Sequence, residues 1–378
     1  MSRPFTFYEF FAGGGMARLG LGERWRCVFA NDFDPLKAQT YRANFEGAAE
    51  HFREGDVWKL TADDLPGRAD LAWASSPCQD LSLAGARAGL DGGRSSAFWG
   101  FWRLIEQLAG QGRAPETVVI ENVAGLATSN SGRDFAAVCE ALAAAGYWFG
   151  ALHLDAAAFV PQSRPRLFIV ASRQPPHEVH AEPSRFHSAP IVEAAGSLTG
   201  EAAARWLWWP LPEPPLSNAP LTNLLEPDAE APWRSAAATG ALLGQLSSEH
   251  RRRLEMLKAS GLRRVGAVYR RMRVENDRKV QRAEVRFDGF AGCLRTPRGG
   301  SSRQLLLLVD KGRVRSRWLT AREAARLMGL PDDYRLPKAQ TAALQVIGDG
   351  VAVPVVRHLA AHLLEPLLRP TSGAFAAA

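Results

Sequence analysis

Short apolar runs alternate with helix-like segments over the first 173 residues of this chain of 378, and no other feature of the sequence constrains the fold more. Five of the runs are typical of buried strands: FTFYEFFA (5–12), RCVFAND (26–32), DLAWASS (70–76), TVVIENV (117–123) and RLFIVAS (166–172). Residues 135–145 predict a helix with Asp134 as N-cap and Gly146 as its stop. Strands and helices that alternate in this way form a mostly parallel sheet with helices on both faces, which is the α/β class.

The length of the chain suggests two domains, and the sequence indicates where they divide. A Pro-rich stretch from residue 174 onward shows neither the spacing of apolar residues typical of a helix nor that typical of a strand. Its WLWWP cluster is expected to form a small hydrophobic nucleus. Helical spacing returns at residues 320–331 and 353–368. We therefore predict a first domain, an insertion, a return to the first domain and a disordered tail: 1–173, 174–316, 317–370 and 371–378.

Positive charge is concentrated in one segment. The net charge is +7, but residues 251–317 hold 20 Lys and Arg against 6 Asp and Glu. That segment alone carries +14, and the remainder carries −7. Such a field is expected of a protein that binds a phosphate backbone, and the alternative is a solvated basic surface.

Composition makes several classes of protein improbable. No run of about 18 apolar residues offers a membrane span, and the N-terminus lacks the pattern of a secretory signal, so we expect a cytoplasmic protein without a membrane partner. The cysteines form no CxxC pair: Cys27, Cys78, Cys139 and Cys293. This spacing argues against a zinc site or a disulfide framework. His358 and His362 lie four apart but lack a third ligand nearby, so we expect no metal.

The segment FYEFFAGGGMARLGLG places a glycine run between a strand and a helix, where a backbone can approach a ligand closely. Asp32 follows Gly13 by 19 residues, the offset at which a carboxylate reaches ribose hydroxyls. Phe33 is placed to lie against an adenine ring. Asp56 stands at the end of what should be the third unit of the strand-and-helix pattern. These residues predict a nucleoside pocket. Because no GxxxxGK[ST] loop occurs, an adenosine with an amino-acid arm fits as well as a dinucleotide, while a turn glycine beside a solvated Asp32 is the alternative.

Cys78 lies in SPCQD, directly after a predicted strand, at the sheet edge where open α/β sheets bind ligands. Pro77 stiffens this loop. A cysteine there is a candidate nucleophile when positive charge or helix amides stabilise its thiolate. Cys139, on an apolar helix face, is expected to be inert packing.

A second polar centre follows the strand TVVI, at Glu121. The stretch PQSRPRLFIV then presents Gln162, Arg164 and Arg166 at alternate positions, so that all three face one side of a strand. The two arginines are suited to position a carboxylate or a base oxygen.

These motifs resemble those of a known family. FxGGG, PCQ, ENV, QSRPR, LTAREAARLMG and a late GDGV occur in the order seen in cytosine-5 DNA methyltransferases. The chain is similar to that family over nearly its whole length, except at 174–316, where the family keeps its variable target-recognition region. The resemblance implies a Rossmann-like mixed sheet of the class I methyltransferase type, with a second, smaller target-recognition domain inserted. It also implies methyl transfer from S-adenosylmethionine to carbon 5 of a cytosine flipped out of DNA.

The resemblance also implies residue roles. The nucleophile falls on Cys78, the catalytic glutamate on Glu121, and the supporting arginines on Arg164 and Arg166. Cofactor contacts fall on Phe11, Gly13, Gly15, Asp32, Phe33, Asp56, Pro77, Asp349 and Val351. The chain departs from the family pattern at Met16, where a further glycine is common, and at Asp349, where asparagine is usual.

The implied partner is double-stranded DNA, with a cognate restriction endonuclease as a possible biological partner and a monomer as the expected state. The stretch from Ser82 to Arg94 resembles the mobile loop that closes over the extruded base. GCLRTPRGGSSRQ combines three arginines with flexible glycines, as expected of a loop that enters a groove. The predicted DNA contacts are Ser82, Arg94, Gln162, Arg295, Arg298 and Arg303.

Three rival interpretations remain. A transfer-RNA cytosine-5 methyltransferase shares the core, but the size of 174–316 favours DNA. A catalytically silent DNA-binding protein on the same scaffold conflicts with intact Cys78 and Glu121. A dinucleotide oxidoreductase explains the glycines but leaves PCQ and ENV without purpose.

Overall fold

The computed structural model describes residues 3–77, 97–176, 178–215, 220–228, 231–275, 277–296 and 303–369. The chain divides into two compact units. The α/β unit comprises residues 1–154, 165–213 and 355–378, and the antiparallel unit comprises 155–164 and 214–354. The α/β unit thus continues to residue 213, which is 40 residues past the predicted boundary at 173, because the WLWWP segment packs on it. The predicted limits of the target-recognition domain remain a proposal about function.

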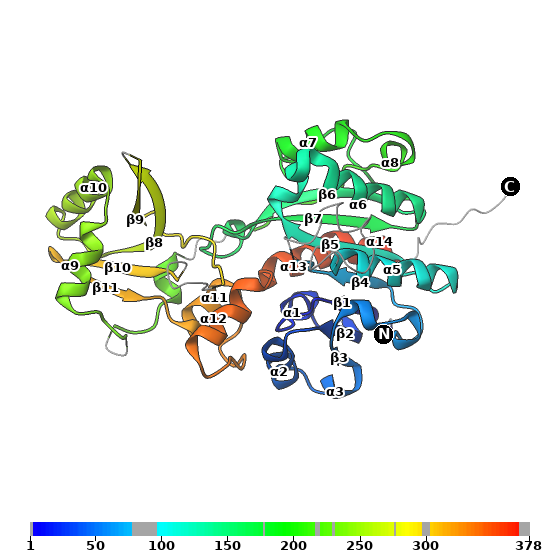
Figure 1. Ribbon diagram of the computed structural model, residues 1–378, viewed down its shortest axis with the longest axis horizontal. Helices are drawn as coiled ribbons and strands as arrows, with labels where there is room; N and C mark the ends of the chain where they lie inside the picture. Colours follow the sequence, from blue (N-terminus) through cyan, green and yellow to red (C-terminus); the bar gives the residue numbers. More distant parts are fainter. Residues whose placement is uncertain are drawn as a thin grey trace. The chain divides into compact units, whose positions relative to one another are not determined.

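The α/β unit is built on a seven-stranded sheet of order β3-β2-β1-β4-β5-β7-β6 (Figure 1). Its strands are β1 (Phe5–Phe10), β2 (Trp25–Asp32), β3 (Phe52–Glu54), β4 (Leu71–Ala74), β5 (Thr117–Val123), β6 (Trp148–Asp155) and β7 (Pro165–Ser172). The pairings among β1 to β5 are parallel, whereas β7 runs antiparallel to β5. This mixed sheet confirms the predicted fold class.

All five predicted strands are present, because continuous apolar runs are what a sheet covered on both faces requires. β3 and β6 were not predicted. β6 contains Gly150, which ordinarily weakens a strand. Here a Cβ on Gly150 would lie 2.1 Å from the carbonyl oxygen of Leu207, so glycine is needed for the close approach of the WLWWP segment.

Helices flank this sheet (Figure 1). They are α1 (Met16–Leu21), α2 (Pro35–Asn44), α3 (Ala48–His51), α5 (Ala97–Gly110), α6 (Arg133–Ala144), α7 (Ala189–Gly196) and α8 (Gly200–Ala204). The predicted stop of α6 is confirmed, since Gly146 follows it with φ 82°. The predicted N-cap is wrong: α6 begins after Gly132, and Asp134 lies in its first turn, where its carboxylate accepts a hydrogen bond from Ser129.

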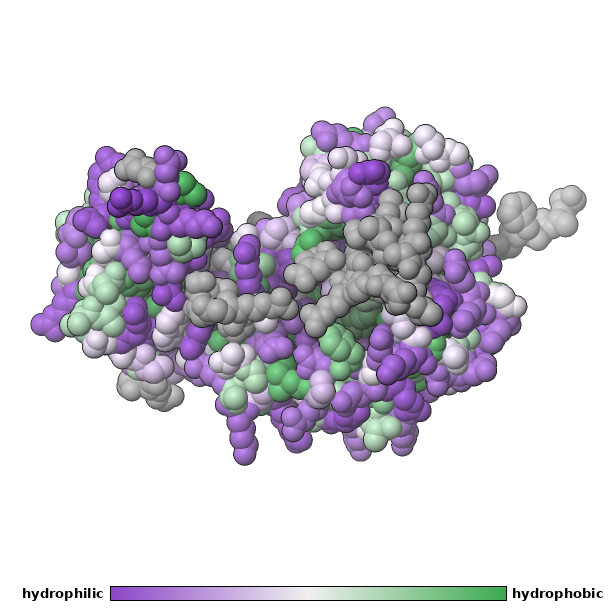
Figure 2. Space-filling view, in the orientation of Figure 1, coloured by the Kyte–Doolittle hydropathy of each residue, from purple (hydrophilic) through white to green (hydrophobic). Residues whose placement is uncertain are grey.

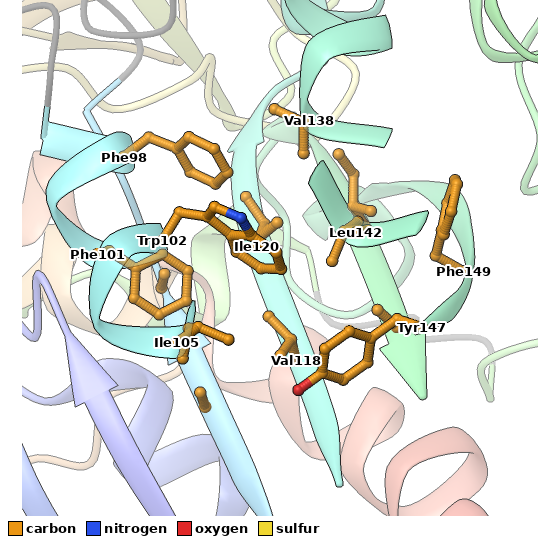
Figure 3. Close-up of a cluster of buried hydrophobic side chains, with 14 of the residues drawn as sticks. Phe98, Phe101, Trp102, Ile105, Val118, Ile120, Val138, Leu142, Tyr147 and Phe149 are labelled. Atoms are coloured by element: carbon orange, nitrogen blue, oxygen red, sulfur yellow. The ribbon is translucent and has the colours of Figure 1, made fainter. Parts of the chain in front are cut away.

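The main core joins α5 and α6 to β5 (Figure 3). Trp102 and Phe98 of α5 face Ile120 of β5, and Leu142 reaches the same cluster from α6. Nearby, Trp209 of the WLWWP segment is fully buried and donates a hydrogen bond to the carbonyl of Val170 at 3.0 Å. The prediction that this segment forms a hydrophobic nucleus is confirmed.

The antiparallel unit contains a four-stranded sheet of order β11-β10-β8-β9. Its elements are α9 (Ala236–Gly244), α10 (Ser248–Ala259), β8 (Arg264–Glu275), β9 (Arg278–Arg286), β10 (Leu305–Asp310), β11 (Arg313–Trp318), α11 (Ala321–Leu327) and α12 (Gln340–Asp349). Leu242, Leu254, Val268 and Leu307 form its own core. On the face shown in Figure 2, hydrophilic residues dominate the surface around the β8–β9 hairpin.

One helical stretch requires a correction. Residues 340–368 are long and apolar enough, by length and composition alone, to cross a membrane, although no such segment was predicted from the sequence. More than half of its most apolar window is buried in the protein, as in the core helices of soluble proteins. The stretch also breaks at Gly350, whose backbone is extended, before α13 (Val353–Leu359), a π-helical turn (Ala360–Leu364) and α14 (Glu365–Leu368).

Candidate active site

The loop after β1 has an unusual backbone. Phe11, Gly13 and Gly15 have φ of 57°, 56° and 80°, in the left-handed region. For Phe11, which has a Cβ, this conformation is strained, and such strain concentrates at functional sites. A Cβ on Gly15 would lie 2.1 Å from the ring of Phe45, whereas the same position on Gly13 has no atom within 4 Å. The loop therefore presents open backbone at Gly13.

Asp32 holds this loop to the end of β2. One of its carboxylate oxygens accepts the N–H of Gly13 at 2.8 Å, and the other accepts the N–H of Asp34 at 2.9 Å. Asp32 is only 4% exposed. Burial raises the pKa of Asp32, and the charge of Lys37 and the two N–H donors partly oppose that rise.

The remaining predicted cofactor residues of this unit lie at the same edge of the sheet. Phe10 pairs with Asn31 and Ala74, so the carboxyl ends of β1, β2 and β4 are adjacent. Phe33, just past β2, is 66% exposed. Asp56, past β3, is exposed and accepts the N–H of Trp58 at 3.0 Å.

The segment that leads to the predicted nucleophile is anchored from β5. Asn122 donates hydrogen bonds to the carbonyl and the hydroxyl of Ser76, at 3.1 and 3.2 Å, and both residues are buried. Pro77 follows and is exposed. Cys78 lies outside the described residues, as do Ser82 and Arg94.

Glu121 is fixed by an arginine from the antiparallel neighbour strand. Its carboxylate forms an ion pair with Nε of Arg166 at 3.1 Å, with side-chain exposures of 8% for Glu121 and 16% for Arg166. Arg166 also donates to the carbonyl of Pro165 at 2.8 Å. Since Val123 lies opposite Arg166 in the β5–β7 register, the sheet itself sets this geometry. A largely buried carboxylate thus stands one residue before the asparagine that anchors Ser76.

Gln162 and Arg164 of QSRPR belong to the antiparallel unit and are buried. Arg164 is 1% exposed and donates to backbone carbonyls of that unit. Gln162 is fully buried: it donates to the carbonyl of Leu327 at 2.7 Å and accepts the N–H of Leu294 at 3.1 Å. The Gln162 amide is thus enclosed and hydrogen bonded within the unit, and its contact with DNA stays a prediction.

Two predicted DNA contacts lie close together. Arg295 and Arg303 line one small hollow of the antiparallel unit, together with Gln304. Arg295 is exposed, while the guanidinium of Arg303 lies 5.0 Å from the ring centroid of Trp318, and burial lowers the pKa of Arg303. Arg298 is outside the described residues. In the late GDGV motif, Asp349 is exposed and accepts a hydrogen bond from the Thr296 hydroxyl, whereas Val351 is buried.

Comparison with known proteins identifies the family. The family described as C-5 cytosine-specific DNA methylase matches residues 5–365. The chain belongs to this family. Relatives of the methylase include the Type II methyltransferase M1.ScrFI of Lactococcus lactis subsp. cremoris, 26% identical over 96% of this chain and 79% of the relative. Another is M.HhaI of Haemophilus parahaemolyticus, 24% identical over 94% of this chain and 93% of the relative.

Solved structures agree on the fold. The methylase resembles the S. pombe Dnmt2 methyltransferase with a TM-score of 0.58 and 19% identity, covering 96% of this chain and 99% of that one. It resembles the Entamoeba histolytica methyltransferase EhMeth with a TM-score of 0.62 and 13% identity, covering 97% and 98%. The family resemblance drawn from the motifs is confirmed, and the methylase is a DNA cytosine-5 methyltransferase.

One polar cluster of the methylase was not predicted from the sequence. Glu9, inside the apolar run of β1, is 1% exposed and accepts the N–H of Arg18 at 3.3 Å and the hydroxyl of Tyr41 at 3.4 Å. Burial raises the pKa of Glu9 to about 8. A single acid within FTFYEFF was the available signal, because a charge in a buried strand needs partners. This cluster ties α1, which follows the glycine loop, to β1.

In the part of the methylase that the structure describes, no group of three or more His, Cys, Asp or Glu side chains could hold a metal ion. His358 instead pairs its Nε2 with the carbonyl of Pro212 at 3.0 Å.

Proposed function

We propose that this methylase transfers the methyl group of S-adenosylmethionine to carbon 5 of a cytosine flipped out of double-stranded DNA, with Cys78 as nucleophile. One observation carries the proposal. Glu121, paired with Arg166, is followed directly by Asn122, which anchors Ser76 two residues before Cys78. In a chain matched to the methylase family over residues 5–365, this arrangement supports a carboxylate and a thiol acting on one base.

The chemistry explains the residue types. Carbon 5 of cytosine is a poor nucleophile until a group adds to carbon 6, and a thiolate is suited to this addition. The Cys78 sulfur forms a bond to carbon 6 while Glu121 stabilises the ring at nitrogen 3 and the amino group. Carbon 5 then accepts the methyl group, and loss of its proton to solvent breaks the bond to sulfur and releases Cys78. Arg166 keeps the Glu121 carboxylate oriented during these steps.

The residues at the sheet edge fit the cofactor. Bound S-adenosylmethionine supplies an electrophilic methyl group on a sulfonium. The open backbone at Gly13 allows close approach of a ligand, and the exposed ring of Phe33 offers a face for adenine. Asp32 uses two acceptor positions on backbone N–H groups, and a carboxylate has about four, so two remain for ribose hydroxyls. Asp56 is a further proposed contact, and the contacts that the family resemblance implies at Asp349 and Val351 stay predictions.

The proposed substrate follows from charge as well as family. Flipping a base costs a few kcal/mol, which favourable phosphate contacts offset. The basic segment 251–317 and the proposed target-recognition domain, 174–316, would supply them, with Arg295 and Arg303 among the contacts. We also propose a cytoplasmic monomer. A cognate restriction endonuclease is the proposed biological partner, in line with relatives named as Type II methyltransferases.

Methylation-sensitive sequencing of DNA from cells that express the chain tests this function and reports the target sequence. We expect cytosine-5 methylation at one short sequence with the wild type. Cys78→Ala should abolish it, and Glu121→Gln should reduce it by roughly 100-fold or more. DNA left unmodified by a folded wild-type protein would overturn the proposal.

A labelled-methyl assay separates the rival substrate. Duplex DNA and transfer RNA are offered at equal nucleotide concentration, with Cys78→Ala as the blank. We expect label in DNA. Label in transfer RNA alone would replace the proposed substrate while leaving the proposed chemistry intact.

A further inference from the structure

Arg164 joins two segments of the antiparallel unit that are far apart in the sequence. Its Nη1 donates to the carbonyl of Leu294 at 2.8 Å and to the sulfur of Cys293 at 3.4 Å. Its Nη2 donates to the carbonyls of Gly348 and Gly350, at 2.9 and 2.6 Å. One buried guanidinium thus connects residues 293–294 with the carboxyl end of α12.

The two segments also touch without Arg164. A Cβ on Gly348 would lie 2.8 Å from backbone atoms of Arg295 and Thr296, so only glycine allows this approach. The Thr296 hydroxyl donates to the carboxylate of Asp349. We call residues 293–296 the stem, because they lead along the chain into the arginine- and glycine-rich stretch that includes Arg298.

Arginine suits this position for a physical reason. The carbonyls at the end of α12 carry the negative end of the helix dipole, which favours a cation. The planar guanidinium directs its donors at fixed angles, so it can hold the stem and the helix end at once. A lysine keeps the charge but loses this fork.

We propose that Arg164 is a positioning residue for target selection. It holds the stem against α12, and it lies two residues before Arg166, which orients Glu121. The inference rests on the proposed function. Pro165 alone separates the two arginines, and proline restricts the backbone between them. A displaced stem would therefore alter both the reading of DNA sequence and the rate of the chemical step at Glu121.

The test uses the target site found by sequencing and duplexes with one base pair changed. We expect Arg164→Lys to lower the ratio of kcat/KM between target and altered duplex by about tenfold, and to lower kcat on the target, because small displacements are costly to catalysis. KM for S-adenosylmethionine should change less than kcat. The matched control is Arg326→Lys, at another arginine of the same unit, which donates to the carbonyl of Leu224 and pairs with Asp332. It should keep the ratio.

Each outcome decides the matter. An Arg164→Lys enzyme with an unchanged ratio, or a control with an equal fall, overturns the inference. If Arg164→Lys does not fold, Thr296→Val, which removes the second tie, takes its place: a fall in the ratio supports the inference and an unchanged ratio overturns it. A folded wild type that methylates no DNA overturns the proposed function, and the inference falls with it.

Discussion

Burial separates the titratable residues of this methylase into structural and reactive ones. Cys27 and Cys139 are buried, and burial raises the pKa of both thiols, that of Cys27 to about 12. Neither forms a thiolate near neutral pH, so neither is a nucleophile. The prediction that Cys139 packs in the core is confirmed. By the same reasoning, the charge state of the buried Glu9 affects stability.

Replacing Glu9 tests this effect of burial. The folded-state pKa of about 8 lies above the ordinary 4.5, so the stability that protonated Glu9 contributes is complete below pH 4.5 and is lost as pH rises through 8. The wild type should lose up to about 1.4 kcal/mol per pH unit from this group within that window. Glu9→Gln should lack this loss and be the more stable protein at pH 8.5. Urea unfolding at pH 5, 7 and 8.5 measures it.

Glu201→Gln provides the control, since Glu201 is an exposed residue of α8. Its unfolding free energy should follow the wild-type pH dependence. Parallel curves for Glu9→Gln and the wild type would show that Glu9 does not titrate in this range.

Helices and strands were predicted correctly where the local sequence pattern determines them. The five apolar runs became strands, and the helical spacing predicted at residues 320–331 became α11, which Thr320 caps. β3 was missed because a strand of three residues is too short to show an alternation of apolar and polar side chains. β6 was missed because it contains Gly150, which allows the close approach of Leu207, a residue distant in the sequence. The Asp134 cap failed because Gly132, with φ 82°, begins the helix earlier.

The cap of α11 yields a quantitative prediction. Thr320 accepts the N–H of Glu323 at 3.2 Å, and the Glu323 carboxylate accepts the N–H of Thr320 at 3.0 Å. Thr320→Ala should lower the free energy of unfolding by about 1 kcal/mol. Thr199→Ala is the matched control, because Thr199 stands at the N-cap of α8 without a side-chain cap bond. Equal losses in the two variants, by chemical denaturation, would contradict the capping role.

The site was predictable to a similar degree. Motif spacing indicated that an arginine positions a carboxylate, and Arg166 does pair with Glu121. The environment of Arg164 was not predictable, because its carbonyl partners at Leu294 and Gly348 lie 130 and 184 residues away. Local pattern cannot distinguish an arginine that faces DNA from one that backbone carbonyls enclose.

For the whole molecule, charge predicts how affinity responds to salt. Several arginines of the basic segment are engaged by acids, among them Arg273 with Glu284 and Arg282 with Glu275, so fewer act freely than a count suggests. The net +14 sets an upper limit: a plot of log affinity against log salt should be steeper than −1 and no steeper than about −13. Titration of duplex DNA at several salt concentrations measures the slope. A flat response would contradict a phosphate-binding role for 251–317.

The covalent step is tested most directly by a duplex that carries 5-fluorocytosine at the target position. Fluorine cannot leave carbon 5 as a proton does, so the bond from Cys78 to carbon 6 should persist. We expect the wild type with S-adenosylmethionine to give a complex that survives denaturation, with the mass of protein plus methylated strand, and Cys78→Ser to give none. A Cys78→Ser protein that still methylates ordinary cytosine at the wild-type rate would contradict the mechanism.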